Sequence, residues 1–121
     1  MRVELHPDGR TATLLESITW DTIVVPAGFV TDFASVPRAL WILIPPQGRH
    51  SFAAVVHDWL YQSQQLTRRE ADRLFRLSLR ATGSGNCKAW AMYLGVRLGG
   101  WVAWGKHARV LQSRRDSKRR P

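Results

Sequence analysis

The chain has 121 residues, a formal net charge of +9 and an apolar fraction of 45%. This length suits one domain with a core of its own, and this composition excludes a wholly disordered protein. A single cysteine, Cys87, excludes an internal disulfide framework, so nothing requires an oxidising compartment. The first residues lack the apolar run of a secretory signal, and we expect synthesis in the cytoplasm without export by that route.

The positive charge is concentrated toward the C-terminal end. After Gly105, seven Lys and Arg side chains face one acidic residue, Asp116. We predict a single domain over residues 1–105 and a disordered basic tail over 106–121, because like-charged terminal runs are usually solvated. Such a tail attracts nucleic acid or anionic lipid without sequence specificity, or it serves only to keep the protein soluble.

Residues 2–31 carry the signals of a small antiparallel β-sheet. An alternating stretch, a Pro7-Asp8-Gly9 turn and a second short stretch predict a hairpin. The next segment is rich in β-branched and aromatic residues, which favour strands. We predict strands over 2–6, 11–15, 19–25 and 29–31. Residues 32–50 look irregular, with a short turn of helix near Pro37.

Three helices are predicted after the sheet. The first spans 52–65 and has one apolar side. The second spans 67–81, because Thr67 and Glu70 match a capping box and Thr82-Gly83 can close the helix. The third spans 87–104 and is apolar nearly all round, which favours a core helix. The predicted fold class is α+β, a small N-terminal antiparallel β-sheet followed by three packed helices.

The side of the first helix opposite its apolar face carries an unusual set of polar residues. His57, Asp58 and Tyr61 fall together there at about 100° per residue. A short connection makes the first two helices antiparallel neighbours, so Asp72 of the second can reach His57. Each residue also has a structural reading. Asp72 can pair with Arg76, and Tyr61 can be a core residue with a bonded hydroxyl.

Two chemistries fit this set together with Asp32, which the irregular segment supplies. In one, Asp32, His57, Asp58 and Asp72 bind a divalent cation that activates water. In the other, His57 is a general base held by Asp72, while Asp58 and loop carbonyls hold the cation. Asp32 has its own structural reading, as the cap of a local turn. The residue types alone do not choose between these alternatives.

The motifs of the chain closely resemble those of a phage and prophage family, domain of unknown function number 1353. The matching stretches are 25–38, 57–61, 69–75 and 92–93, with Trp101 after them. The resemblance covers roughly residues 18–104 and leaves the basic tail outside. It implies a product of tailed phages or integrated prophages, made in the host cytoplasm, and it implies no particular activity.

A second resemblance is to bacterial secretory phospholipases of the A2 type, in the parts of the site. It implies that His57 activates water, that Asp58 binds calcium and that Asp72 orients His57. Tyr61 would be a hydrogen-bonding support. The chain departs from those enzymes because it has no disulfides, no secretion signal and no convincing glycine-rich calcium loop. An HD-type phosphohydrolase also has a His-Asp pair, but it needs further histidines, and His50 is the one nearby candidate.

Three functions follow as hypotheses. The first is a cation-dependent hydrolase of the host envelope, with Ca²⁺ or Zn²⁺ as cofactor and a phospholipid ester as substrate. Its tryptophans and basic tail suit an anionic membrane surface. The second is a non-catalytic virion or tail component, with a structural His-Asp site and contacts to phage structural proteins. The third is an accessory protein that binds nucleic acid through 106–121.

Overall fold

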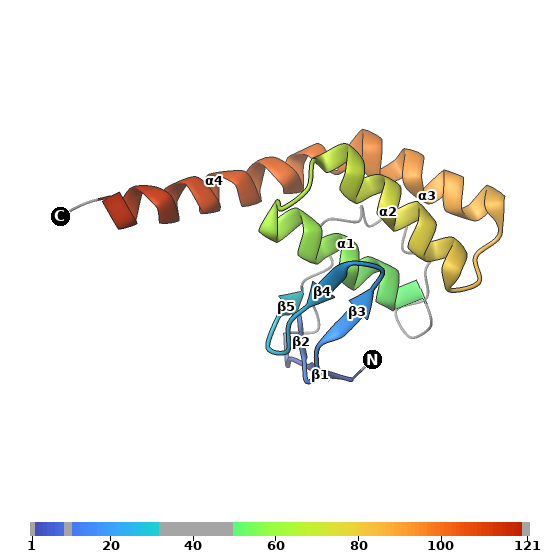
Figure 1. The fold of residues 1–121 in the computed structure, drawn as a ribbon, viewed down its shortest axis with the longest axis horizontal. Helices are drawn as coiled ribbons and strands as arrows, with labels where there is room; N and C mark the ends of the chain where they lie inside the picture. Colours follow the sequence, from blue (N-terminus) through green and yellow to red (C-terminus); the bar gives the residue numbers. More distant parts are fainter. Residues whose placement is uncertain (1, 9–10, 32–49, 120–121) are drawn as a thin grey trace.

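The computed structural model describes residues 2–8, 11–31 and 50–119. In these ranges the chain forms five short strands and four helices, which confirms the α+β class (Figure 1). The strands are β1 (Val3–Leu5), β2 (Ala12–Leu14), β3 (Ile18–Trp20), β4 (Ile23–Val25) and β5 (Val30–Thr31). The helices are α1 (His50–Ser63), α2 (Arg68–Ala81), α3 (Asn86–Gly99) and α4 (Trp101–Arg119). The expectations for 32–49, including Asp32, lie outside the described residues.

The strands form two small antiparallel sheets. One has the order β1-β2-β5, with Ala12 opposite Thr31, and the other is the β3-β4 hairpin. The prediction of a single strand over 19–25 is wrong, because the chain turns between β3 and β4. Asp21 takes a φ of 55° there, a left-handed conformation that Asp tolerates better than most residues.

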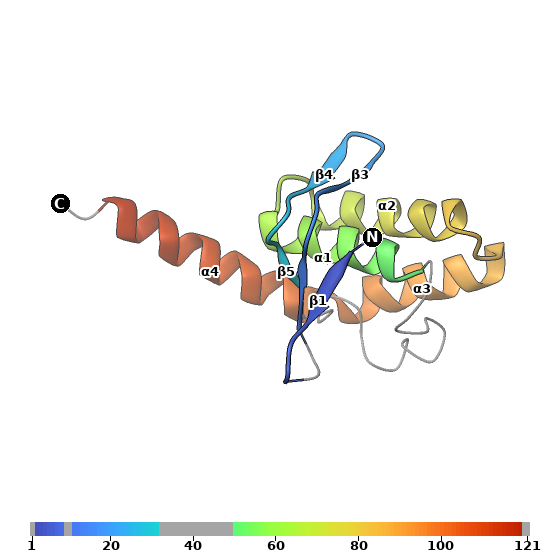
Figure 2. The same ribbon diagram turned by 90° about the horizontal axis from the view of Figure 1, so that it is seen from below.

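Helix α1 lies between the strands and helix α2 (Figures 1 and 2). Val55, Val56 and Leu60 are buried in the same cluster as the strand residues Leu14 and Val25. Ala53 and Ala54 instead join a second cluster with side chains of α2 and α3. Both sides of α1 are therefore covered, and its polar residues are enclosed with its apolar ones.

The capping box of helix α2 is confirmed. The Thr67 side chain accepts a hydrogen bond from the backbone N–H of Glu70, and the Glu70 side chain accepts one from the backbone N–H of Thr67. These bonds satisfy N–H groups that have no partner within the helix. Thr67 is therefore the N-cap of helix α2, which begins one residue later than predicted, at Arg68, and this start fixes which of its side chains face α1.

The predicted third helix is two helices that run end to end, α3 and α4 (Figure 1). The backbone bonds continue across the junction, from Gly100 N to Val96 O at 2.8 Å and from Trp104 N to Gly100 O at 3.0 Å. Only one side of α3 belongs to the core: Met92 and Val96 are buried, while Leu98 is 79% exposed. The prediction of a core helix therefore holds for one face alone.

Residues 106–119 are helical and continue helix α4, whereas the charge run predicts a disordered tail. Lys, Arg, Gln, Ala and Leu are good helix formers, and they make up most of this segment. Gln112 also donates a hydrogen bond to Asp116 one turn later, at 3.1 Å. The C-terminal part of α4 extends away from the rest of the molecule (Figure 1). Within the described ranges, no helix combines the length and the apolar character needed to cross a bilayer.

Candidate functional site

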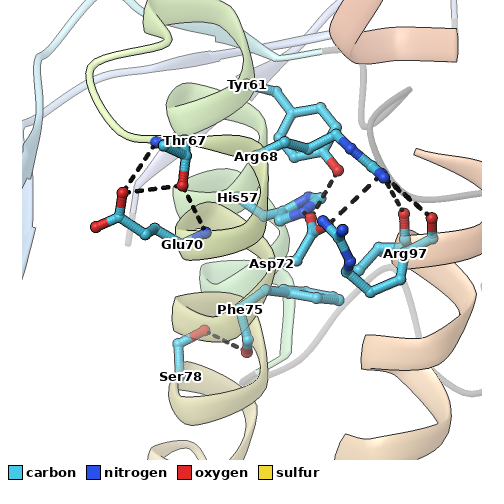
Figure 3. A network of polar contacts seen from close by, with 10 residues as sticks. His57, Tyr61, Thr67, Arg68, Glu70, Asp72, Phe75, Ser78 and Arg97 are labelled. Carbon is cyan, nitrogen blue, oxygen red and sulfur yellow. Dashed lines mark hydrogen bonds and ion pairs between the residues drawn. The ribbon is translucent and has the colours of Figure 1, made fainter. Parts of the chain in front are cut away.

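The centre of the site is a contact between helices α1 and α2 (Figure 3). Nε2 of His57 lies 2.7 Å from Oδ1 of Asp72, and both side chains are fully buried. The two residues are 15 positions apart in the chain and meet because the helices are antiparallel neighbours. Asp72 thus reaches His57, as the helical phases predict. The roles of the two residues in catalysis stay predictions.

Tyr61, one turn after His57, belongs to the same network. Its hydroxyl donates a hydrogen bond of 2.6 Å to Oδ1 of Asp72, the oxygen that His57 also contacts. The His57 ring packs against two aromatic rings, with centroids 4.3 Å from Tyr61 and 4.6 Å from Phe75. The Asp72 carboxylate therefore holds Nε2 of the imidazole, and the rings of Tyr61 and Phe75 pack against it.

Two arginines bind the other oxygen of Asp72. Nη1 of Arg97 lies 3.0 Å from Oδ2 of Asp72, and Nη1 of Arg68 lies 3.7 Å from it. Arg68 also donates to the carbonyl oxygens of Val96 and Arg97 at the end of helix α3, at 3.2–3.3 Å. The carboxylate thus contacts side chains of α1, α2 and α3, and its charge is balanced by one arginine of α2 and one of α3.

These arginines are the functional neighbours that sequence reasoning missed. Helical spacing predicts Arg76 as a partner of Asp72, but the Arg76 guanidinium lies 4.3 Å from the centre of the Trp90 ring. Arg68 stands four residues before Asp72 and Arg76 four residues after it, so helical spacing is the same for both. Arg97 is 25 positions away, and no local pattern signals it.

The ionisation of the network follows from its contacts. Burial alone would raise the pKa of Asp72. The hydrogen bond and charge of His57, followed by the hydrogen bonds from Tyr61 and Arg97, outweigh burial and lower this pKa below its ordinary value of 3.8. Burial raises the pKa of Tyr61, and the hydrogen bond to Asp72 and the negative charge of Asp72 raise it further. Arg68 lowers this pKa by a smaller amount. Asp72 is therefore an acceptor and Tyr61 a donor at neutral pH.

Asp58 lies next to His57 in the chain and contacts strand β5. Its Oδ2 accepts hydrogen bonds from Oγ1 of Thr31 at 2.5 Å and from Nε2 of Gln62 at 3.2 Å. The bond to Thr31 joins helix α1 to strand β5 through two buried side chains. The structure thus brings together His57, Tyr61 and Asp72, and it places Asp58 with Thr31.

Asp32 and Asp58 are the predicted cation ligands. His57 and Asp72 join them in the alternative in which all four side chains bind the cation. Asp32 directly follows Thr31, the partner of Asp58, and lies outside the described residues. In the part of the chain that is described, no three His, Cys, Asp or Glu side chains gather as a metal site. A divalent cation at Asp58 stays a prediction.

The fold and site define a small α+β domain with a buried His-Asp-Tyr network between two antiparallel helices. Residues 11–96 match a family model described as "Protein of unknown function (DUF1353)", and the chain belongs to this family. The matched region includes His57, Tyr61 and Asp72 together with Asp58 and Thr31.

One relative is an uncharacterized protein, y4jT, of Sinorhizobium fredii (strain NBRC 101917 / NGR234). It is 36% identical over 74 residues, which are 60% of this chain and 22% of the relative. The aligned part is thus less than a quarter of the relative's own length. No solved structure matches the chain.

Proposed function

We propose that the protein is a small hydrolase in which His57 is the general base and Asp72 its positioning residue. The observation that carries the proposal is the 2.7 Å contact between Nε2 of His57 and Oδ1 of Asp72, supported by the Tyr61 hydroxyl. A histidine whose one ring nitrogen is held by a carboxylate is a recurring arrangement for activating a nucleophile. The family match covers all three residues but assigns no activity to them.

The chemistry follows from the tautomer that the network selects. Asp72 is an acceptor, so a neutral His57 carries its proton on Nε2. As the proposed general base, His57 takes a proton from a water molecule as the water oxygen attacks an ester carbonyl carbon. The imidazolium that forms is stabilised by the Asp72 carboxylate, and it returns its proton to the leaving alkoxide. Arg97 and Tyr61 keep the carboxylate in place through these steps.

The substrate class is proposed from resemblance. The helix pair that carries His57, Tyr61 and Asp72 is similar in its parts to secretory phospholipases of the A2 type, which favours a phospholipid ester. Similarity to phage and prophage proteins favours the host envelope as the place of action, reached from the cytoplasm or in a virion. A divalent cation, Ca²⁺ or Zn²⁺, held by Asp58 with Asp32 belongs to the same proposal, and oxygen ligands would favour Ca²⁺.

The test is hydrolysis of phospholipid by the purified protein, with added Ca²⁺ or Zn²⁺ and with a chelator. We expect His57→Ala to lower turnover by about 10²–10⁴-fold, the usual contribution of a general base. His6→Ala is the matched control, since the His6 ring contacts the Thr11 and Thr13 side chains of the first hairpin. Full activity in folded His57→Ala protein would refute the proposed base.

The role of Asp72 needs a separate measurement, because its loss also removes a partner of Arg97. We expect Asp72→Asn to lower kcat far more than it changes KM, and to alter the pH profile of kcat/KM. A purely structural role would reduce the amount of folded enzyme and leave that profile unchanged. Urea unfolding of the same variant separates the two effects.

The second candidate is a non-catalytic virion or tail component in which the network only locks the helices together. Burial supports it, since His57, Asp58, Tyr61 and Asp72 all have a relative exposure of 0%. It predicts that His57→Ala lowers the melting temperature and prevents assembly into particles, with no turnover in any preparation. Absence of the protein from purified virions would count heavily against this role.

A further inference from the structure

Helix α3 turns an uncharged apolar face to solvent. Buried Ala89, Met92 and Val96 mark its core side. After Asn86, its exposed residues are Cys87, Trp90, Ala91, Leu94, Leu98 and Gly99. No Lys, Arg, Asp or Glu stands among them. A helix face in ordinary contact with water carries such residues, so this face needs another explanation.

Four of the large side chains form one row, which we name the apolar row: Trp90, Leu94, Leu98 and Trp101. Their exposed fractions are 47%, 55%, 79% and 63%. The spacings of four, four and three residues place them on one side of a helix. The row passes from α3 into α4, because the backbone hydrogen bonds continue through Gly100.

Cationic side chains are exposed on the helix beside the apolar row and on the helix that continues it. Helix α2, which packs beside α3, exposes Arg69, Arg73 and Arg80 against one exposed acid, Glu70. Arg76 of the same helix lies over the ring of Trp90. Beyond Trp101, helix α4 exposes six basic residues against Asp116: Lys106, Arg109, Arg114, Arg115, Lys118 and Arg119. The apolar row therefore lies between an arginine-rich helix and a basic extension.

We propose that the apolar row is a docking surface for an anionic lipid bilayer. Its leucines and tryptophans enter the boundary between headgroups and acyl chains, while arginines of α2 and basic residues of α4 contact lipid phosphates. Tryptophan favours this boundary because one part of its ring is apolar and its N–H is polar. The protein lies on the surface through α3 and the start of α4.

Charge favours this occupant over two others. A second copy docked through the same row would bring the exposed arginines of both α2 helices close together, and like charges there oppose association. A nucleic acid would satisfy the cations but leave Leu94 and Leu98 in water. An anionic bilayer satisfies the apolar and the cationic groups at once.

The test is cosedimentation with vesicles of phosphatidylcholine alone and of phosphatidylcholine mixed with phosphatidylglycerol. We expect binding to the mixed vesicles only, and weaker binding as salt is added. Leu98→Gln should weaken binding about tenfold, because it removes an apolar side chain from the buried contact. Leu5→Gln is the matched control, since Leu5 is 71% exposed on strand β1 and lies outside the row.

A charge variant completes the design. Arg73→Gln should weaken binding to mixed vesicles by about fivefold, the usual effect of one basic residue near an anionic surface. Equal binding of Leu98→Gln and the wild-type protein would overturn the proposal. So would a dimer in analytical ultracentrifugation that Leu98→Gln dissociates, or duplex DNA binding in place of vesicle binding.

This inference deepens the proposed hydrolase, because it names the surface on which an ester substrate would be met. The two can fail separately. His57→Ala should bind mixed vesicles as the wild-type protein does, since His57 is buried and away from the exposed row. Vesicle binding with no hydrolysis overturns the hydrolase alone, and hydrolysis of dispersed ester with no vesicle binding overturns the docking surface alone.

Discussion

Gly100, at the junction of helices α3 and α4, is the position where one methyl group should matter most. A Cβ atom there would collide with the Tyr61 hydroxyl oxygen and lie 3.2 Å from its ring carbon Cζ. It would also lie 2.5 Å from the carbonyl oxygen of Val96. The Tyr61 hydroxyl cannot yield easily, because the side chain is fully buried and donates its hydrogen bond to Asp72.

The expected size of the effect combines two opposing contributions. Forcing a methyl group into a packed site costs about 1–3 kcal/mol. Replacing Gly by Ala in a helix returns roughly 0.5–1 kcal/mol, because the unfolded chain loses freedom. Gly100→Ala should therefore lower the free energy of unfolding by about 1–2 kcal/mol, which is roughly 3–8 °C in Tm for a chain of this size.

Gly105→Ala is the matched control on helix α4, which starts directly after Gly100. A Cβ at Gly105 meets nothing within 4 Å, so only the favourable helical contribution remains. We expect Gly105→Ala to be neutral or stabilising by up to about 1 kcal/mol. Urea unfolding followed by circular dichroism gives both values. Equal stability of the two variants would refute the packing of Gly100 against Tyr61.

Four further predictions concern stability. Tyr61→Phe should cost about 1.5–3 kcal/mol by removing a hydrogen bond to a carboxylate, measured by urea unfolding. The free energy of unfolding of the wild-type protein should also fall as the pH rises past 10.0, because Tyr61 ionises there in the unfolded chain but not in the folded protein. Tyr61→Phe should lack this loss. Because folding lowers the pKa of Asp72 from 3.8, the ionised carboxylate stabilises the folded protein above that pH, and this stabilisation is lost as the pH falls further. The difference in the free energy of unfolding between the wild-type protein and Asp72→Asn should therefore disappear in acid. Thr67→Ala should cost about 1 kcal/mol, seen as a lower Tm, by removing the cap of α2.

Local signals predicted the parts of the fold that depend on local chemistry. The Thr67–Glu70 pair satisfies backbone groups within a few residues of itself, so the start of helix α2 could be read from the sequence. Helical phase then placed Asp72 toward His57, because that phase depends only on the helix start and on an antiparallel neighbour. The first hairpin was predictable for the same reason, through its Pro7-Asp8-Gly9 turn.

Other features depend on contacts between distant segments. The stretch 19–25 reads as one strand because β-branched and aromatic residues flank Asp21 on both sides, and pairing of β3 with β4 places the turn there. Arg97 reaches Asp72 only because the last turn of α3 packs beside the first turn of α2. The burial of His57 follows likewise from cover on both sides of α1, whereas one helix considered alone has a solvent side.

The sequence does not show which face of helix α3 is exposed to solvent. A helix that is apolar nearly all round has no polar side to mark which face is outward, so length and composition alone favoured the core. The outward face follows from packing between helices. Met92 and Val96 of α3 join a buried cluster with Phe75 of α2, and Arg97 reaches Asp72 from the same helix. Leu94 and Leu98 are left exposed. The packing that secures the candidate site therefore also leaves the apolar row exposed, and Arg68 adds hydrogen bonds to the carbonyl oxygens of Val96 and Arg97 that hold α3 in that orientation.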